Sequence, residues 1–227
     1  LTVDVTKAII AEAKENACQL VLAHHPLLMR SVHTIAETTG KGSLLSNAVR
    51  AGIAIFAAHT NADVVADGVS DTFAKQLGLS QIRPLVSTQE GQIGHGRIGA
   101  FDKPVSLGDL AVALGRLLPP TAQGVKVAGD FSQQVSMIAL CGGAGDSFIA
   151  DAAVAGADVY ITSDLRHHPV QEARENFPQL AFIDVAHWAS ESLWLESAAR
   201  MLSERHPDIE WIVSQVRTDP WDFVVTQ

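Results

Sequence analysis

The sequence predicts an α/β protein with two α/β lobes, each with a mostly parallel or mixed sheet. Short apolar runs typical of buried strands alternate with amphipathic helical segments, which is the pattern of sheets covered by helices. The alternation breaks at residues 86–101, where a glycine-rich stretch indicates a bend, and then resumes. We therefore expect a first lobe at residues 1–88 and a second at residues 89–227, whose last strand can return to the first lobe.

The first lobe is expected to contain helices and strands in strict alternation. The helices are expected at residues 3–17, 43–51 and 71–77, and the strands at residues 18–23 and 53–58. In the first helix Asp4 or Thr6 is placed to cap the N-terminus, and Ile9, Ile10 and Ala13 share one apolar face. Each strand runs directly into a polar cluster that contains histidine, and residues 59–63 read as a polar turn.

The second lobe repeats this alternation with more strands. Helices are expected at residues 106–118 and 148–155 and in a segment that ends near residue 202. Strands are expected at residues 125–128, 134–140, 158–161, 180–185 and 209–216. Two of these strands also end in polar clusters with histidine, at residues 162–168 and 186–191.

Composition excludes several classes of protein. Of 227 residues, 47% are hydrophobic and 18% are charged, which is typical of a globular chain and not of a disordered one. The formal charge of −9 disfavours general nucleic-acid binding, and the longest apolar runs fall short of the roughly 20 residues of a membrane span. The two cysteines indicate no disulfide framework, so we expect a cytoplasmic protein.

Histidines gather where the expected strands end. Of nine histidines, the six that follow a strand are His24, His25, His59, His167, His168 and His187. In open α/β sheets, loops converge at the carboxyl ends of strands, and ligands bind there. Asp63 lies four residues after His59, and Glu191 lies four residues after His187.

Taken separately, each pair has an ordinary structural explanation. His24 and His25 could cap a strand, Asp63 could bond its own turn, and Glu191 could cap a helix. Together they supply imidazoles and carboxylates without thiolates from three strand ends. That donor set favours a Zn, Fe, Mn, Co or Ni site over a structural zinc finger.

Seven segments, in order along the chain, resemble one known family. They are LTVDVT at 1–6, LAHHPLL at 22–28, AHTNAD at 58–63, GVSDTFAKQLGL at 68–79, GHGRIG at 94–99, ADVYITSDLRHH at 157–168 and DVAHWASE at 184–191. In combination they resemble the Nif-three-like dinuclear-metal proteins, the GTP cyclohydrolase 1 type 2 homologues. Family members carry an earlier Trp-Asp-Asn segment that is absent here, so we expect a truncated or partly observed chain. They also usually have Gly where this chain has Ala186.

The resemblance implies a metal centre in the cleft between the two lobes. The implied ligands of two divalent ions, whether Zn, Fe, Mn, Co or Ni, are His24, His25, Asp63, His187 and Glu191. His59 is implied as a further ligand or as a group that orients one. The resemblance also implies a toroidal homohexamer.

The function that follows is metal-dependent hydrolysis of a nucleotide, with GTP supplied by the resemblance alone. A hydroxide that bridges the metals would open the purine ring, while His59 or His168 moves protons. The alternative is a metal-binding, metal-delivery or scaffold protein without turnover. In either case the expected partners are copies of the same chain, with no nucleic acid and no membrane.

Overall fold

The computed structural model describes residues 1–88 and 93–226, and it confirms the mixed α/β class. The chain forms two compact units: unit 1 combines residues 1–62 with 195–218, and unit 2 combines residues 63–194 with the residues from Asp219 onward. Residues 89–92, where we expected the second lobe to begin, lie outside the described residues. The flanking strands β3 (Ser80–Ser87) and β4 (Gly94–Ser106) pair with each other, so both belong to unit 2.

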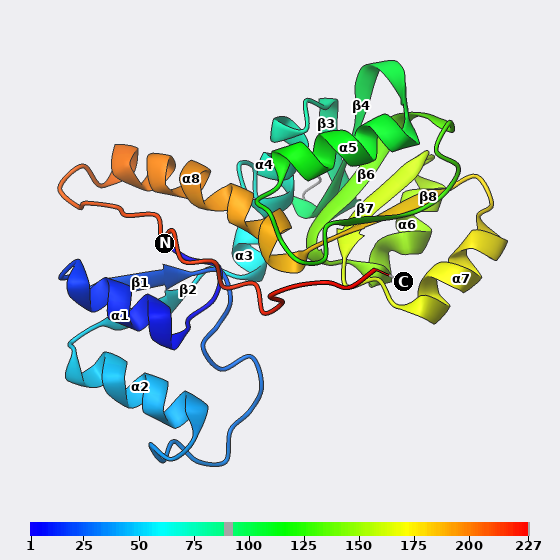
Figure 1. Cartoon of the computed structure of the whole chain (residues 1–227). Coiled ribbons are helices and arrows are strands. Elements are labelled where there is room, and N and C mark those ends of the chain that lie inside the picture. The colour runs from blue at the N-terminus through cyan, green and yellow to red at the C-terminus, as the bar shows by residue number, and fades with distance from the viewer. Residues whose placement is uncertain (89–92, 227) are drawn as a thin grey trace. The chain divides into compact units, whose positions relative to one another are not determined.

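Unit 1 contains a two-stranded parallel sheet with helices packed against it (Figure 1). Its elements are α1 (Lys7–Glu15), β1 (Leu20–Ala23), α2 (Gly40–Arg50), β2 (Ala54–Ala57) and most of α3 (Thr60–Asp63). The side chain of Thr6 caps α1 by accepting a hydrogen bond from the Ile9 N–H. Ile9, Ile10 and Ala13 are buried, as their spacing predicted, and they pack against residues of β1 and α2.

Unit 2 is built on a six-stranded mixed sheet with the order β3-β4-β6-β7-β8-β5. The strands not yet bounded are β5 (Val125–Ala128), β6 (Gln134–Ala144), β7 (Val159–Ser163) and β8 (Ala181–Val185). The central strands β6, β7 and β8 run parallel, while β3, β4 and β5 join the sheet through antiparallel pairs. The parallel centre brings the carboxyl ends of β6, β7 and β8 to one edge.

Helices cover both faces of this sheet (Figure 1). The helices of unit 2 are α4 (Val69–Gln76), α5 (Leu107–Leu117), α6 (Ile149–Val154), α7 (His167–Asn176) and the first part of α8 (His187–Arg205), and a short 3₁₀ turn (Asp146–Phe148) precedes α6. One apolar cluster joins one sheet face to α4, α5 and α8, and another joins the opposite face to α6 and α7. Because both faces are buried, β7 and β8 are buried at every position.

Three local predictions were wrong. Residues 59–63, expected as a turn, contain the short helix α3. Residues 209–216, expected as a strand, form no strand. The segment instead makes two hydrogen bonds with Leu1: the Ser214 N–H donates to the Leu1 carbonyl at 2.9 Å, and the Leu1 amino group donates to the Ile212 carbonyl at 2.6 Å. The glycine-rich stretch expected to bend between lobes is, in its described part, the strand β4.

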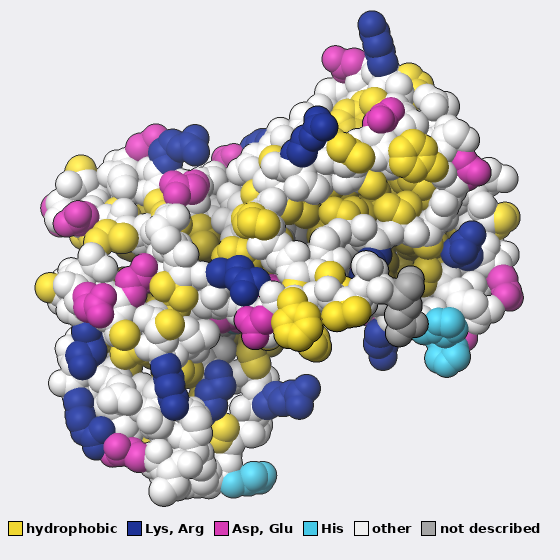
Figure 2. Space-filling model, in the orientation of Figure 1, with side chains coloured by type: hydrophobic (Ala, Val, Ile, Leu, Met, Phe, Trp, Pro, Cys, Tyr) yellow, Lys and Arg dark blue, Asp and Glu magenta, His cyan; other side chains and the backbone are white. Residues whose placement is uncertain are grey.

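The described surface carries both apolar and charged side chains. Figure 2 shows apolar side chains exposed on unit 2 on the face where α5 lies. Exposed large apolar residues include Val112 of α5, at 48%, and Phe131, at 71%. Among the described residues, every helix is too short or too polar to cross a bilayer.

Candidate metal centre

Three histidines come together in unit 1. β1 ends at Ala23 and is followed directly by His24 and His25, and β2 ends at Ala57, two residues before His59. Because the two strands are parallel and in register, their carboxyl ends adjoin. The three ring centroids lie 5.0, 5.2 and 5.5 Å from one another, and one nitrogen of each ring lies within 4.8 Å of the other two.

In two of these rings, those of His24 and His25, the Nδ1 atom has an oxygen partner. His24 Nδ1 donates to the Ala58 carbonyl at 2.9 Å, since a carbonyl oxygen only accepts. His25 Nδ1 lies 2.8 Å from Oδ1 of Asp4, whose other oxygen accepts a hydrogen bond of 2.6 Å from the Thr218 hydroxyl. In neutral imidazole a protonated Nδ1 leaves the lone pair on Nε2, the arrangement that metal-binding histidines use.

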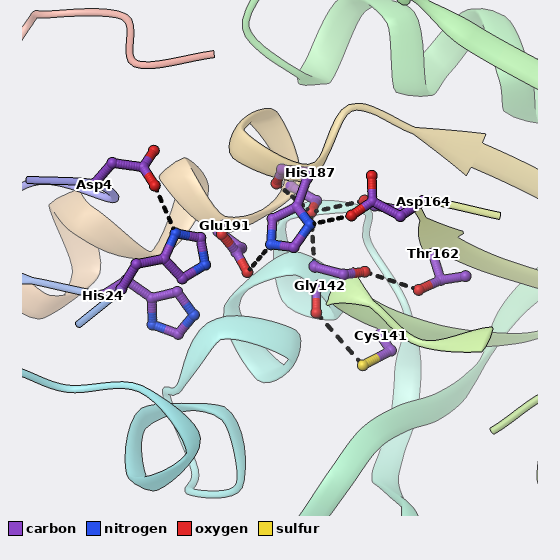
Figure 3. Close-up of polar contacts among 12 residues, drawn as sticks. Asp4, His24, Cys141, Gly142, Thr162, Asp164, His187 and Glu191 are labelled. Carbon is purple, nitrogen blue, oxygen red and sulfur yellow. Dashed lines mark hydrogen bonds and ion pairs between the residues drawn. The ribbon is translucent and has the colours of Figure 1, made fainter. Parts of the chain in front are cut away.

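Unit 2 carries a second group at the start of α8. His187 is the first residue of the helix and Glu191 lies one turn later, so their side chains share a face. His187 Nε2 lies 2.9 Å from Glu191 Oε1, and His187 Nδ1 lies 2.7 Å from Asp164 Oδ2 (Figure 3). Glu191 is 3% exposed, whereas Asp164 is exposed in the turn after β7.

These two carboxylates govern the charge of His187. Burial, the largest single contribution, opposes protonation, but the hydrogen bonds and charges of Asp164 and Glu191 outweigh it and raise the pKa of His187 to about 10. The hydrogen bond with His187 in turn lowers the pKa of Asp164. Without a metal, His187 is therefore a cation at neutral pH, bracketed by two acidic side chains.

The end of β6 approaches these side chains closely. Gly143 has a φ of +70°, and a Cβ at this position would lie 2.4 Å from Glu191 Oε1 and 3.2 Å from His187 Nε2. The Gly143 N–H donates to the Ser190 hydroxyl, and its carbonyl accepts from Thr162. Only glycine fits here without displacing the side chains of α8.

Asp63 is the last residue of α3 and is half-buried. Its negative charge acts on Cys141, which lies in β6 two residues before Gly143. Burial is the main reason that the pKa of Cys141 rises to about 12, and the negative charges of Asp63 and Glu191 raise it further. Both carboxylates of unit 2 that were expected as ligands therefore act on one thiol.

His168, expected to move protons, lies outside the histidine group of unit 1. It is the second residue of α7 and is exposed, and its ring centroid lies 5.1 Å from that of its neighbour His167. Its role stays a prediction.

Sequence reasoning missed the carboxylates that contact Nδ1 of His25 and of His187. Asp4 was considered only as a helix cap, and Asp164 had no assigned role. Asp164 did carry a signal, because it directly follows a strand, as the histidines do. Its φ of +57° is uncommon for a residue other than glycine and recurs at functional sites.

The donor chemistry fits divalent metals. Imidazole nitrogens with their far nitrogen hydrogen-bonded, together with nearby carboxylates, suit Zn, Fe, Mn, Co or Ni better than Mg or Ca. Unit 1 presents three imidazoles whose ligand atoms lie within 4.8 Å of one another, and unit 2 presents one imidazole in contact with two carboxylates.

Comparison with known proteins gives concordant matches. The model of the family Duf34/NIF3 (NGG1p interacting factor 3) matches residues 1–220. A Streptomyces coelicolor protein named "GTP cyclohydrolase 1 type 2 homolog" is 43% identical over 226 residues, covering 96% of this chain and 79% of that protein. A Nostoc protein of the same name is 36% identical, covering 96% and 80%. The crystal structure of a Bacillus cereus protein related to NIF3 has a TM-score of 0.90 at 22% identity, covering 98% of this chain and 88% of that one, which shows a shared fold.

Proposed function

Because the chain belongs to the Duf34/NIF3 family, as its motifs indicated, we propose that it binds divalent metal ions and acts as a metal-dependent hydrolase on a nucleotide. The proposed ligands are His24, His25 and His59 in unit 1 and Asp63, His187 and Glu191 in unit 2. That both sets serve one pair of ions, in the cleft implied by the resemblance, stays a prediction. The relatives named GTP cyclohydrolase 1 type 2 homolog support a purine nucleotide as the substrate class.

One observation carries the metal assignment. His24, His25 and His187 each have Nδ1 within 2.9 Å of an oxygen acceptor, and two of these acceptors are carboxylates. Core histidines need a single polar partner and do not require this uniform orientation. The shared use of Nδ1 leaves Nε2 as the metal-binding atom of each ring, and at His187 this Nε2 lies 2.9 Å from Glu191, the other proposed ligand on α8.

The chain's own groups would each do a defined task. Asp4 and Asp164 orient imidazoles and raise their basicity. Gly143 keeps backbone, and no side chain, beside Glu191 and His187. When bound, divalent ions would supply activation of water and polarisation of a substrate oxygen.

A second candidate function is metal binding or delivery without turnover, in which a cavity of unit 2 would serve a purpose other than presenting a substrate to the metal ligands. A cavity of about 570 Å³ in unit 2 lies between α7 and the strands β5 and β8, with Lys126, Arg166 and Phe182 in its wall. That volume would accommodate a small molecule. Its lining includes neither His187 nor Glu191, so this cavity does not present a substrate to those side chains.

One comparison separates the two functions. The protein is stripped with chelator, reloaded with Zn²⁺, Mn²⁺, Fe²⁺, Co²⁺ or Ni²⁺, and incubated with GTP. The hydrolase proposal expects formate release and a ring-opened product only from reloaded protein. The Glu191→Gln variant should lose both metal and turnover. Stoichiometric metal binding without product under all five metals would instead support the second candidate.

A further inference from the structure

Arg97 is a buried charge whose every donor is used. Its side chain is 2% exposed, and it projects from β4. Nε donates to Asp71 Oδ1 at 2.8 Å, and Nη1 donates to the carbonyls of Gly94 and Gly96 at 2.8 and 2.7 Å. Nη2 donates to two further carbonyls, so all five N–H groups of the guanidinium have acceptors.

Those two carbonyls belong to the residues that follow Asp63. Arg97 Nη2 lies 2.6 Å from the Val65 oxygen and 3.3 Å from the Val64 oxygen. The Gly94 N–H adds a hydrogen bond of 3.0 Å to the same Val64 oxygen. The backbone directly after Asp63 is therefore tied to β4 at two consecutive peptide groups.

Asp71 ties the far end of the same loop. Its Oδ2 accepts from the Asp67 N–H at 2.9 Å and pairs with Lys75 Nζ at 2.7 Å. Although burial acts against ionisation, the hydrogen bonds from Lys75 and Arg97 keep the pKa of Asp71 below its usual value. Asp67 has a φ of +58°, a conformation that persists only where its surroundings hold it.

We infer that Arg97 is a positioning residue for Asp63, holding its carboxylate where it binds metal through the carbonyls of Val64 and Val65. This inference rests on the proposed function, because it takes Asp63 as a ligand. The side chain has to be arginine: the rigid fork serves one carboxylate and four carbonyls at once, whereas lysine has three donors on a flexible stem. Residues behind the ligands of a metal commonly change its affinity 10- to 100-fold.

A double-mutant cycle tests the inference with Co²⁺ as the probe, read by its visible absorption and by equilibrium dialysis. The four proteins are wild type, Arg97→Lys, Asp63→Ala and the double variant. We expect Arg97→Lys to weaken Co²⁺ binding about 10- to 100-fold in wild type and to have no further effect once Asp63 is absent. Urea unfolding of all four proteins measures the purely structural loss, which should be the same in both backgrounds.

Lys75→Ala is the matched control. It removes a charge from the same network at a half-exposed side chain and leaves both carbonyl ties intact, so Co²⁺ affinity should stay within twofold of wild type. Should Arg97→Lys fail to fold, Asp71→Asn replaces it. That change removes the anchoring charge but keeps a hydrogen-bond acceptor, and its smaller loss of affinity should likewise vanish in the Asp63→Ala background.

The outcomes separate this inference from the function on which it rests. An unchanged Co²⁺ affinity in Asp63→Ala would overturn Asp63 as a ligand and with it the inference. A large effect of Asp63→Ala combined with an unchanged affinity in Arg97→Lys, or with equal losses in both backgrounds, would overturn the positioning role alone.

Discussion

The carboxylate of Asp4 lies 2.8 Å from Nδ1 of His25, and its second oxygen is occupied by the Thr218 hydroxyl. Asp4 is thus fixed on one side by a residue more than two hundred positions away while it orients an imidazole on the other. A carboxylate held in this way does two things to a histidine: it selects the tautomer and it keeps the ring from rotating.

Replacing Asp4 by Ala should weaken metal binding about 10- to 100-fold, because His25 would lose the acceptor that fixes its Nδ1 proton. Zn²⁺ affinity measured by competition with a chelator tests this. Thr218→Val is the graded control, since it removes one hydrogen bond to Asp4 but leaves the contact with His25, and it should cost clearly less. Equal affinity in Asp4→Ala and wild type would show that His25 does not depend on this carboxylate.

The double variant His187→Ala, Glu191→Ala should lose bound metal without unfolding, because both side chains lie at the start of α8 and neither is central to an apolar cluster. Metal content by mass spectrometry and circular dichroism give the two readouts. His206→Ala removes an exposed histidine just after α8 and should leave the metal content unchanged. Full metal occupancy of the double variant would contradict the assignment of both residues.

Metal binding should release a proton from His187. With a pKa of about 10 in the metal-free chain, its ring is protonated at pH 7.5, and a ligand nitrogen has to be free of its proton. Calorimetry of Zn²⁺ binding in two buffers of different ionisation enthalpy should show this proton, and affinity should rise as pH approaches 10. Asp164→Asn lowers the pKa of His187 and should reduce the release at pH 8.5. Identical heats in both buffers would exclude a protonated ligand.

The same pKa predicts how the metal-free protein responds to pH. A folded-state pKa raised from 6.5 to about 10 contributes stability that is fully present below pH 6.5 and is lost as pH rises through 10. Urea unfolding of metal-free protein should therefore show a decline across this interval that is weaker in Asp164→Asn. A flat profile in wild type would mean that His187 is neutral in the folded state.

Gly143→Ala should lower both stability and metal content, because its Cβ would lie 2.4 Å from Glu191 Oε1. Gly156→Ala separates the effect of backbone strain from that of the clash with Glu191. Gly156 has a comparable φ of +79°, but nothing lies within 4 Å of a Cβ at this position. Both variants should lose about 1–3 kcal/mol through backbone strain, and only Gly143→Ala should lose metal. Equal metal content in the two variants would show that Glu191 can move away from the added Cβ and still bind metal.

The chain should assemble into a homo-oligomer, with six copies as the expected number. Trp194 is buried in the chain, while Trp221 is 63% exposed, and the same C-terminal segment also exposes Phe223, at 80%, and Val225, at 77%. Adjacent exposed apolar side chains are typical of surfaces that a partner covers. Light scattering should give a multiple of 24.1 kDa, which Phe223→Ser with Val225→Ser reduces. A monomer at micromolar concentration would refute the assembly.

Much of the fold follows from local pattern. Apart from α7 and the hairpin of β3 and β4, the helix and strand cores of both units lie where the alternation placed them, because buried parallel strands and amphipathic helices have distinct periods. The sequence pattern did not predict the hairpin of β3 and β4. Pro84 argues against a strand, yet it is tolerated because β3 is at the edge of the sheet. The glycines of β4 indicated a turn, but Gly96 and Gly99 are there because a Cβ would lie 2.8 Å from a backbone oxygen of a neighbouring strand.

The candidate site likewise has features that the sequence predicts and features that only tertiary packing creates. The spacing of His187 and Glu191 on one helix, and of histidines at strand ends, is visible in the sequence. The links His25–Asp4 and Arg97–Val65 are not, because they join residues 21 and 32 positions apart through tertiary packing. The strand expected at 209–216 failed for a related reason. Its apolar alternation is real, but the segment pairs with Leu1 alone, through two backbone hydrogen bonds, and does not form a ladder.

The composition of unit 1 sets an order for folding on the ribosome. Its first part ends at residue 62 and its second part begins at residue 195, with most of unit 2 encoded in between. At about 5–20 residues per second, translation of residues 63–194 takes roughly 7 to 26 s. During that interval the nascent residues of α1, β1 and β2 lack the segment that later supplies Thr218 to Asp4. The sheet of unit 2 is synthesised whole within this window, so the histidine group, although its histidines are made first, is completed only after that sheet.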